Sequence, residues 1–168
     1  MLQWTKFGRV LDPALDALAE RGLSFAQSPA AVDLGDRLRV YFCSRTVAED
    51  GLATSRIYHA DFDRADPSRL LAVCTEPVVP LGDTGCFDEF GMNPVSAVRQ
   101  GGEIRLYYAG WTRCASVPFN AAIGVVVSED GGRSFRRPGP GPVLSYCPDE
   151  PFVIGSPRVK IFEGRWHL

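Results

Sequence analysis

Two pairs of adjacent acidic residues precede segments of similar apolar sequence. Asp88 and Glu89 come before GMNPVSAV, and Asp149 and Glu150 come before VIGSPRV. Carboxyl groups that meet at one site suit glycoside chemistry, in which one protonates the leaving oxygen and another acts as nucleophile or activates water. Asp88, Glu89 and Glu150 are therefore the candidate acid and base, although each could instead cap backbone N–H groups of its own loop.

Five further residues could bind a sugar. Arg45 ends YFCSR, while Trp111 and Arg113 follow YYAG at the equivalent place of a second segment. A tryptophan offers a flat face to the C–H side of a sugar ring, and an arginine suits hydroxyl, carboxylate or phosphate groups. Asn93 could donate a hydrogen bond to a hydroxyl group, and Ser156 has no histidine partner that would make it a nucleophile. Packing between neighbouring repeat units is the alternative for Arg45, Trp111 and Arg113, and turn formation before Pro94 is the alternative for Asn93.

These residues occupy equivalent places in a repeated unit. Pro29, Pro94 and Pro157 begin three similar segments, 65 and 63 residues apart. Each proline is followed by an apolar strand, a turn that contains glycine, and a second strand rich in aromatic and aliphatic residues. Short strands with turn residues about every ten positions predict an all-β fold. A unit of about 65 residues that holds four strands is typical of a propeller blade.

The repeat predicts a β-propeller of four-stranded antiparallel blades, of which the chain holds two blades and part of a third. Because blades bury their faces against neighbours in a closed ring, we expect the chain to be a fragment, with missing blades or self-association covering its open face. The expected single domain, 1–168, divides into an N-terminal strand and short helix in 1–23, a first blade in 24–85, a second in 86–147 and the start of a third in 148–168.

Two local patterns refine these boundaries. Asp12 and Pro13 are typical of a helix start, with Leu15 and Leu18 on its apolar face and Gly22 at its end. The segment SEDGGRSF, 128–135, matches the Asp-box pattern, in which an aspartate accepts backbone N–H groups in a tight turn and an aromatic ring packs beneath it. We expect this turn to be structural and not catalytic.

Composition narrows the function classes. The net charge of −2 and the pI near 5.7 offer no basic field for nucleic acid. The chain has neither a secretory leader pattern nor about 18 consecutive apolar residues, so we expect a cytoplasmic protein without a membrane partner. Five scattered cysteines, no Cys-x-x-Cys and only two histidines predict buried free thiols and no metal.

The succession AQSP, YFCSR, GCFDEFGMNP, YYAGW, GPVLS and DEPFVIGSP resembles glycosidases of the five-bladed propeller class, which includes arabinanases, levansucrases, invertases and β-mannoside phosphorylases. The resemblance implies five blades and a funnel-shaped site in which three acidic residues act on furanosides or mannosides without a cofactor. The active enzymes offer an aspartate near the place of Gln27 and Ser28, and relatives read Gly-Asp-Pro where this chain has Gly155, Ser156 and Pro157. Both departures remove a carboxylate.

The sequence thus favours a glycosidase-like protein, a hydrolase or phosphorylase, that acts on carbohydrate through Asp88, Glu89 and Glu150. Loss of activity in this fragment is one of the outcomes that the two missing carboxylates allow. The alternative is a non-catalytic glycan-binding propeller or an accessory module of a sugar-modifying protein. The number of carboxylates at the shared opening of the blades distinguishes the enzyme from the binding protein, because glycoside cleavage needs an acid and a base there.

Overall fold

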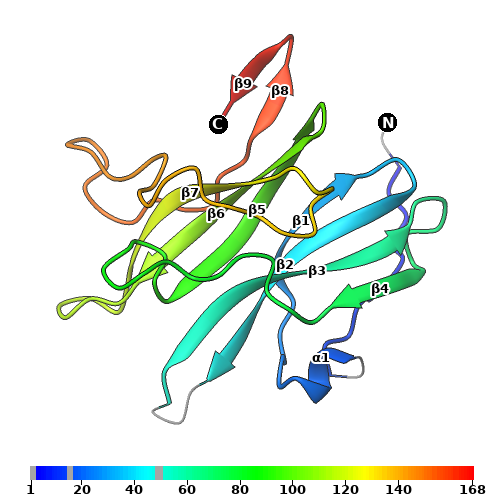
Figure 1. The fold of residues 1–168 in the computed structure, drawn as a ribbon, viewed down its shortest axis with the longest axis horizontal. Coiled ribbons are helices and arrows are strands. Elements are labelled where there is room, and N and C mark those ends of the chain that lie inside the picture. The colour runs from blue at the N-terminus through cyan, green and yellow to red at the C-terminus, as the bar shows by residue number, and fades with distance from the viewer. Residues whose placement is uncertain (1–2, 15–16, 48–50) are drawn as a thin grey trace.

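The computed structural model describes residues 3–14, 17–47 and 51–168. Within these ranges the fold is almost entirely β, with one short helix, α1 (Ala17–Glu20), beside the first sheet (Figure 1). Residues 3–14 form no strand, so the predicted N-terminal strand is absent there, and aromatic residues of this segment such as Trp4 and Phe7 stay exposed. Leu15, predicted on the helix face, lies outside the described residues.

The first sheet has the four antiparallel strands of a blade, in chain order. Gly35, in the turn between the first two strands, has a φ of 97°, and its N–H donates to Asp33 Oδ1 over 2.8 Å. Glycine suits this turn because a side chain disfavours positive φ. The strands are β1 (Gln27–Asp33), β2 (Arg37–Val47), β3 (Ala53–Asp63) and β4 (Leu70–Cys74).

The second sheet has three strands, β5 (Gly91–Gln100), β6 (Glu103–Thr112) and β7 (Asn120–Ser128). The expected fourth strand is reduced to isolated bridges from Arg136 to Val127 and from Leu144 to Ile123. The cause is the run RPGPGP at 137–142, because proline cannot donate to a strand ladder and glycine weakens it. One parallel bridge, between Ser55 and Gly91, joins these two antiparallel halves, here called the first and second sheets, into one seven-stranded sheet.

The proline-led segments share local backbone features. The ladder is interrupted between Gln27 and Ala30 in β1 and between Pro94 and Ser96 in β5. Ser28 and Ser156, each directly before a proline, have positive φ values of 54° and 57°. Proline has no N–H group to donate to a strand ladder, so an irregular backbone is expected where each unit begins with proline.

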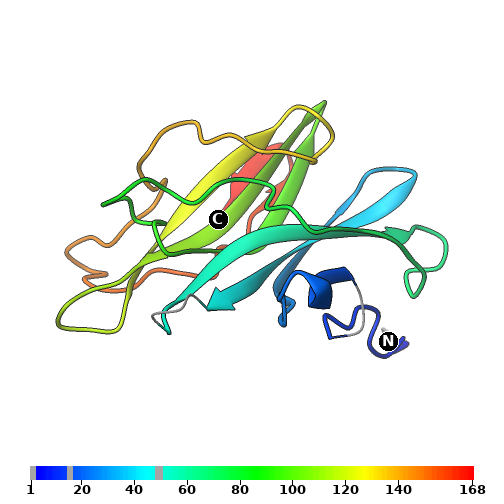
Figure 2. The same cartoon turned by 60° about the horizontal axis from the view of Figure 1, so that its bottom comes forward.

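The third segment leads into a hairpin of β8 (Lys160–Phe162) and β9 (Arg165–His167). The backbone N–H of Val159 donates to Ser96 Oγ, which ties this segment to β5 over 3.1 Å. Trp166 packs against Tyr107 of β6, with ring centroids 6.5 Å apart. The hairpin therefore lies against the face of the second sheet that points away from the first, and the sheets do not close into a ring (Figure 2).

Two apolar clusters cover the opposite faces of the first sheet. Tyr41 and Ile57 pack with Met92, Leu106 and other residues of the second sheet, so this cluster holds the sheets together. Figures 1 and 2 show the α1 segment beside the other face of this sheet. The buried members of the cluster on this face are Leu18, Leu23, Phe42, Tyr58, Ala60 and Phe62.

The turn at 128–135 links the second sheet to the first. Asp130 accepts hydrogen bonds from the backbone N–H groups of Arg133, at 2.9 Å, and Ser134, at 3.1 Å. The ring of Phe135 is buried against Tyr41 with centroids 5.3 Å apart, and the Tyr41 hydroxyl donates to the Gly132 carbonyl over 2.9 Å. The turn thus positions one sheet against the other.

The cysteines differ from their predicted burial. Only Cys43 is buried, and burial raises the pKa of its thiol to about 11. Cys74 and Cys86 are half-buried, whereas Cys114 and Cys147 are exposed because they lie in loops beyond the strands. Among the described residues, no helix has the length and apolar character needed to cross a membrane.

Candidate functional site

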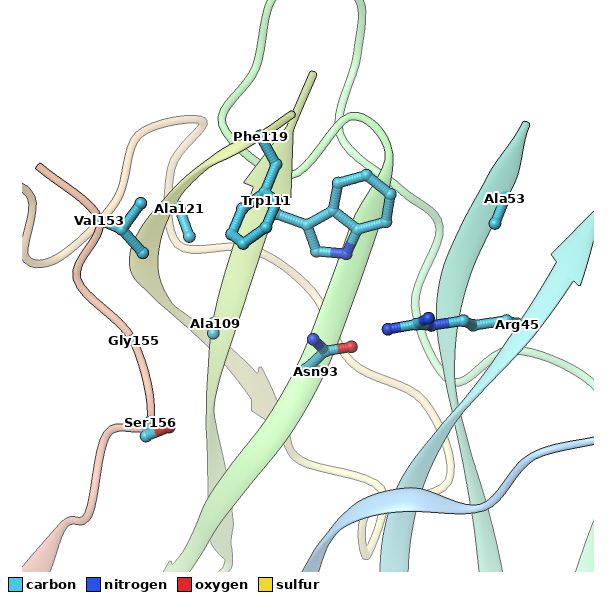
Figure 3. A pocket seen from close by; sticks show the side chains of 10 residues that line it. All are labelled: Arg45, Ala53, Asn93, Ala109, Trp111, Phe119, Ala121, Val153, Gly155 and Ser156. Atoms are coloured by element: carbon cyan, nitrogen blue, oxygen red, sulfur yellow. The ribbon is translucent and has the colours of Figure 1, made fainter. Parts of the chain in front are cut away.

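A pocket of about 420 Å³ opens where β2, β5 and β6 meet the segment that enters the third unit (Figure 3). Strand ends of both sheets contribute to it. Its lining residues are Arg45, Ala53, Asn93, Ala109, Trp111, Phe119, Ala121, Val153, Gly155 and Ser156. Four of the five predicted sugar ligands, Arg45, Asn93, Trp111 and Ser156, are therefore brought together.

Trp111 is held in place by its neighbours. A Cβ atom at Gly91 would overlap the indole ring, so the ring lies directly on the backbone of β5. Phe90 stacks on Trp111 with centroids 6.3 Å apart and planes inclined by 28°. The guanidinium of Arg113 lies 4.1 Å from the centroid of the Phe90 ring and donates to the Ala53 carbonyl over 2.7 Å. Arg113, predicted as a ligand, does not line the pocket but contacts Phe90 and Ala53 behind it.

Arg45 and Asn93 face one another across the pocket (Figure 3). Arg45 is exposed, and no described residue pairs with its guanidinium. Asn93 Oδ1 is buried without a hydrogen-bond partner in the described part of the chain. A buried acceptor without a partner is costly, and a ligand hydroxyl group would relieve that cost.

Asp88, the first acid candidate, is wholly buried and already bound. Its Oδ2 accepts hydrogen bonds from Arg137 Nη2 at 2.7 Å and Nε at 3.1 Å, and from the Tyr108 hydroxyl at 2.8 Å. Burial and the negative charge of Asp88 raise the pKa of Tyr108, so this hydroxyl stays protonated and donates. The carboxylate does not line the pocket, and its contacts fit a positioning role for the loop that enters β5.

The other two acid candidates also lie outside the pocket lining. Glu89 is half-buried and accepts the N–H of Gly85 over 3.0 Å. Glu150 is exposed, in a turn where its backbone pairs with that of Cys147. The predicted sugar ligands therefore converge, whereas the predicted acid and base do not join them.

No lining residue carries a carboxylate, in the part of the chain that the structure describes. Asn93 and Ser156 occupy the positions before their prolines, and Ser28 occupies the same position of the first unit. Neither amide nor hydroxyl side chains supply the acid and base of glycoside cleavage. Within residues 3–14, 17–47 and 51–168, no group of three or more His, Cys, Asp or Glu side chains could hold a metal ion.

Sequence reasoning missed several pocket residues. Ala53, Ala109 and Ala121 provide space because they are small, and Phe119 and Val153 add apolar walls. Alanines in strands carry no chemical signature, so only the strand register reveals them. Arg137 was also missed, because it pairs with Asp88 across a sequence separation of 49 residues.

No family model matches the chain. The uncharacterized protein Rv1502 of Mycobacterium tuberculosis is 33% identical over 167 residues, which cover 99% of this chain and 54% of the relative. A protein of a second strain of this organism matches with the same values. The chain thus spans about half the length of the curated relatives it matches.

Solved structures of glycoside hydrolases resemble the chain. A thermostable family 43 glycoside hydrolase matches 80% of this chain and 44% of its own, at 14% identity and a TM-score of 0.60. A family 117 glycoside hydrolase of Zobellia galactanivorans matches 72% of this chain and 34% of its own, at 16% identity and a TM-score of 0.55. A third structure belongs to glycoside hydrolase family 130, a family of mannoside phosphorylases that contains hydrolases of β-1,2-mannosidic linkages. It matches 68% of this chain and 31% of its own, at 19% identity and a TM-score of 0.51.

These likenesses define the class of fold. The chain has the fold of the propeller glycoside hydrolases, in an open form with two sheets and the hairpin of a third unit. The resemblance that the sequence motifs indicated is thereby confirmed at the level of the fold.

Proposed function

We propose that the chain is a glycosidase-like protein that binds carbohydrate in the pocket between Arg45 and Trp111. The proposal depends mainly on the pocket lining, which joins two aromatic side chains to Arg45, Asn93 and Ser156. Aromatic faces pack on the C–H side of sugar rings, while a few placed polar groups fix orientation. The pocket volume of about 420 Å³ lies in the range of small-molecule sites.

Binding without cleavage is the form of this function that the geometry supports best. Asp88 lies outside the pocket lining and is hydrogen-bonded to Arg137 and Tyr108, and the lining contains no carboxylate among the described residues. Acid or base assistance is worth roughly 10²–10⁴ in rate for each group. A pocket without either group would hold a glycan without cleaving it at an enzymatic rate.

Cleavage by Asp88, Glu89 and Glu150 stays the second candidate, since the structural neighbours are described as glycoside hydrolases and phosphorylases. We also propose a five-bladed ring, with further blades or a second copy covering exposed apolar side chains of the hairpin such as Phe162. A cytoplasmic location is proposed as well. The exposed thiols of Cys114 and Cys147 support it, because free thiols persist in reducing compartments.

Calorimetric titration with arabino-, fructo- and manno-oligosaccharides tests binding. We expect at least one class to bind and the Trp111→Ala variant to lose about tenfold or more in affinity, since an aromatic contact adds roughly 0.5–1.5 kcal/mol beyond its buried area. Trp4→Ala is the matched control, because Trp4 is 87% exposed and lies outside the pocket. Equal affinities of both variants would remove Trp111 from the site.

Chromatography of the same mixtures separates binding from cleavage. The proposal expects the oligosaccharides to be recovered intact, with or without added phosphate. Product release that is lost in Glu150→Gln or Glu89→Gln would instead support the acid and base hypothesis.

A further inference from the structure

We infer that the carbohydrate bound in this pocket carries an anionic substituent, a uronate carboxylate or a phosphate group, which pairs with Arg45. The inference builds on the proposed carbohydrate-binding function. The charge of the pocket lining indicates the charge of the ligand.

The guanidinium of Arg45 lines the pocket, whereas two other arginines around the two sheets are held in ion pairs away from it. Arg39 forms a buried ion pair with Asp61 at 2.7 Å, and Arg137 pairs with Asp88 at 2.7 Å. Arg45 points across the pocket toward Asn93 and pairs with no acidic side chain among the described residues (Figure 3). No described residue therefore neutralises this charge.

The pocket has no described carboxylate to balance this charge. Its polar side chains are Arg45, Asn93 and Ser156, and its other lining residues are apolar or glycine. Arg113, whose guanidinium donates to the carbonyl of Ala53 in the pocket wall, adds a second positive charge close by. Positive groups that line a concave, partly apolar wall concentrate an attractive field for an anion.

The hydrogen-bonding capacity of the pocket favours the same ligand. A guanidinium has five N–H donors and no acceptor, and an asparagine amide has two further donors. The side-chain acceptors of the described lining are Asn93 Oδ1 and the Ser156 hydroxyl, so the donors at the pocket outnumber the acceptors. A carboxylate or phosphate accepts several such donors, and the planar fork of arginine matches a carboxylate with two parallel hydrogen bonds.

Matched oligosaccharide pairs test the inference. Oligogalacturonates are titrated against their methyl esters, and a phosphorylated oligomannoside against its dephosphorylated form. We expect the charged member of one pair to bind about ten- to a hundredfold more tightly, since a hydrogen bond to a charged group is worth roughly 1.5–3 kcal/mol. The pair that shows this preference distinguishes a carboxylate from a phosphate. Added salt should reduce the preference.

Variants assign the preference to Arg45. Arg45→Gln should abolish the difference in affinity between the charged and the neutral member of the pair, whatever its effect on the affinity for the neutral member. Arg9→Gln is the control, because it removes the same charge from the exposed N-terminal segment. An Arg45→Gln variant that retains the preference, or equal binding of charged and neutral members, would overturn the inference. If neutral oligosaccharides still bind and their binding still requires Trp111, the proposed function stands even when this inference fails. If neither charged nor neutral oligosaccharides bind, both the proposed function and this inference are wrong.

Discussion

Replacing Asp88 with asparagine distinguishes a structural carboxylate from a catalytic one. The Asp88 side chain is wholly inaccessible and accepts three hydrogen bonds, two from Arg137 and one from Tyr108. Asparagine keeps the shape but removes the charge, which leaves the guanidinium of Arg137 without its counter-ion at 17% side-chain exposure. Loss of one partner of a buried ion pair costs about 3–5 kcal/mol.

The lower end of this range applies here. Arg137 keeps a hydrogen bond to the Pro80 carbonyl and some contact with water, so we expect a loss of about 3 kcal/mol in unfolding free energy. For a domain of this size each kcal/mol shifts Tm by roughly 2–4 °C, which predicts a decrease of about 6–12 °C. Urea titration and scanning calorimetry measure the two quantities.

Glu89→Gln is the matched control because it changes the adjacent acid. The Glu89 side chain accepts one hydrogen bond, from the N–H of Gly85, at the protein surface. Its replacement should cost no more than about 1 kcal/mol. Unchanged stability of Asp88→Asn, together with lost glycan turnover, would refute the structural role and restore Asp88 as a catalytic candidate.

Three further predictions test the contacts between the sheets and around the pocket. Asp130→Ala should lower the unfolding free energy by about 1–3 kcal/mol in urea titration, because Asp130 accepts a set of turn hydrogen bonds; an unchanged midpoint would contradict its structural role. Burial lowers the pKa of His59 to about 4, below the unfolded value of about 6.5. The unfolded chain therefore binds the proton first, so stability should fall as the pH decreases from about 6.5 to about 4. The His59→Gln variant should lose this part of the pH dependence, and an identical profile would argue against a buried neutral imidazole. Gly91→Ala should displace Trp111 and weaken sugar binding at least about tenfold, whereas Gly102→Ala, which meets open space, should not; equal titration curves would show that the indole position is unimportant.

Much of the fold is predictable because the repeat leaves a local signature. Prolines at the start of each unit and glycine in the following turn fix where strands begin and reverse. The missing fourth strand of the second sheet was mispredicted by analogy with the first, although the RPGPGP run at 137–142 carries the signal that breaks the ladder. The prediction of a fourth strand followed the similarity between the two units and not the local effect of proline and glycine on strand pairing.

The candidate site was predictable to the extent that it follows strand equivalence. Arg45 and Trp111 end equivalent strands, so the repeat places them at one edge. The role of Asp88 was not predictable, because its burial depends on Arg137 from a distant loop. A carboxylate before an inner strand has the same sequence signature whether it faces the pocket or the core.

A structure of the chain with a bound oligosaccharide tests the central claim most directly. We expect a sugar ring against Trp111, with Arg45 and Asn93 in contact with its polar groups and no carboxylate of the described residues beside the glycosidic oxygen. A sugar that lies elsewhere, or one whose glycosidic oxygen contacts Glu89 or Glu150, would contradict it.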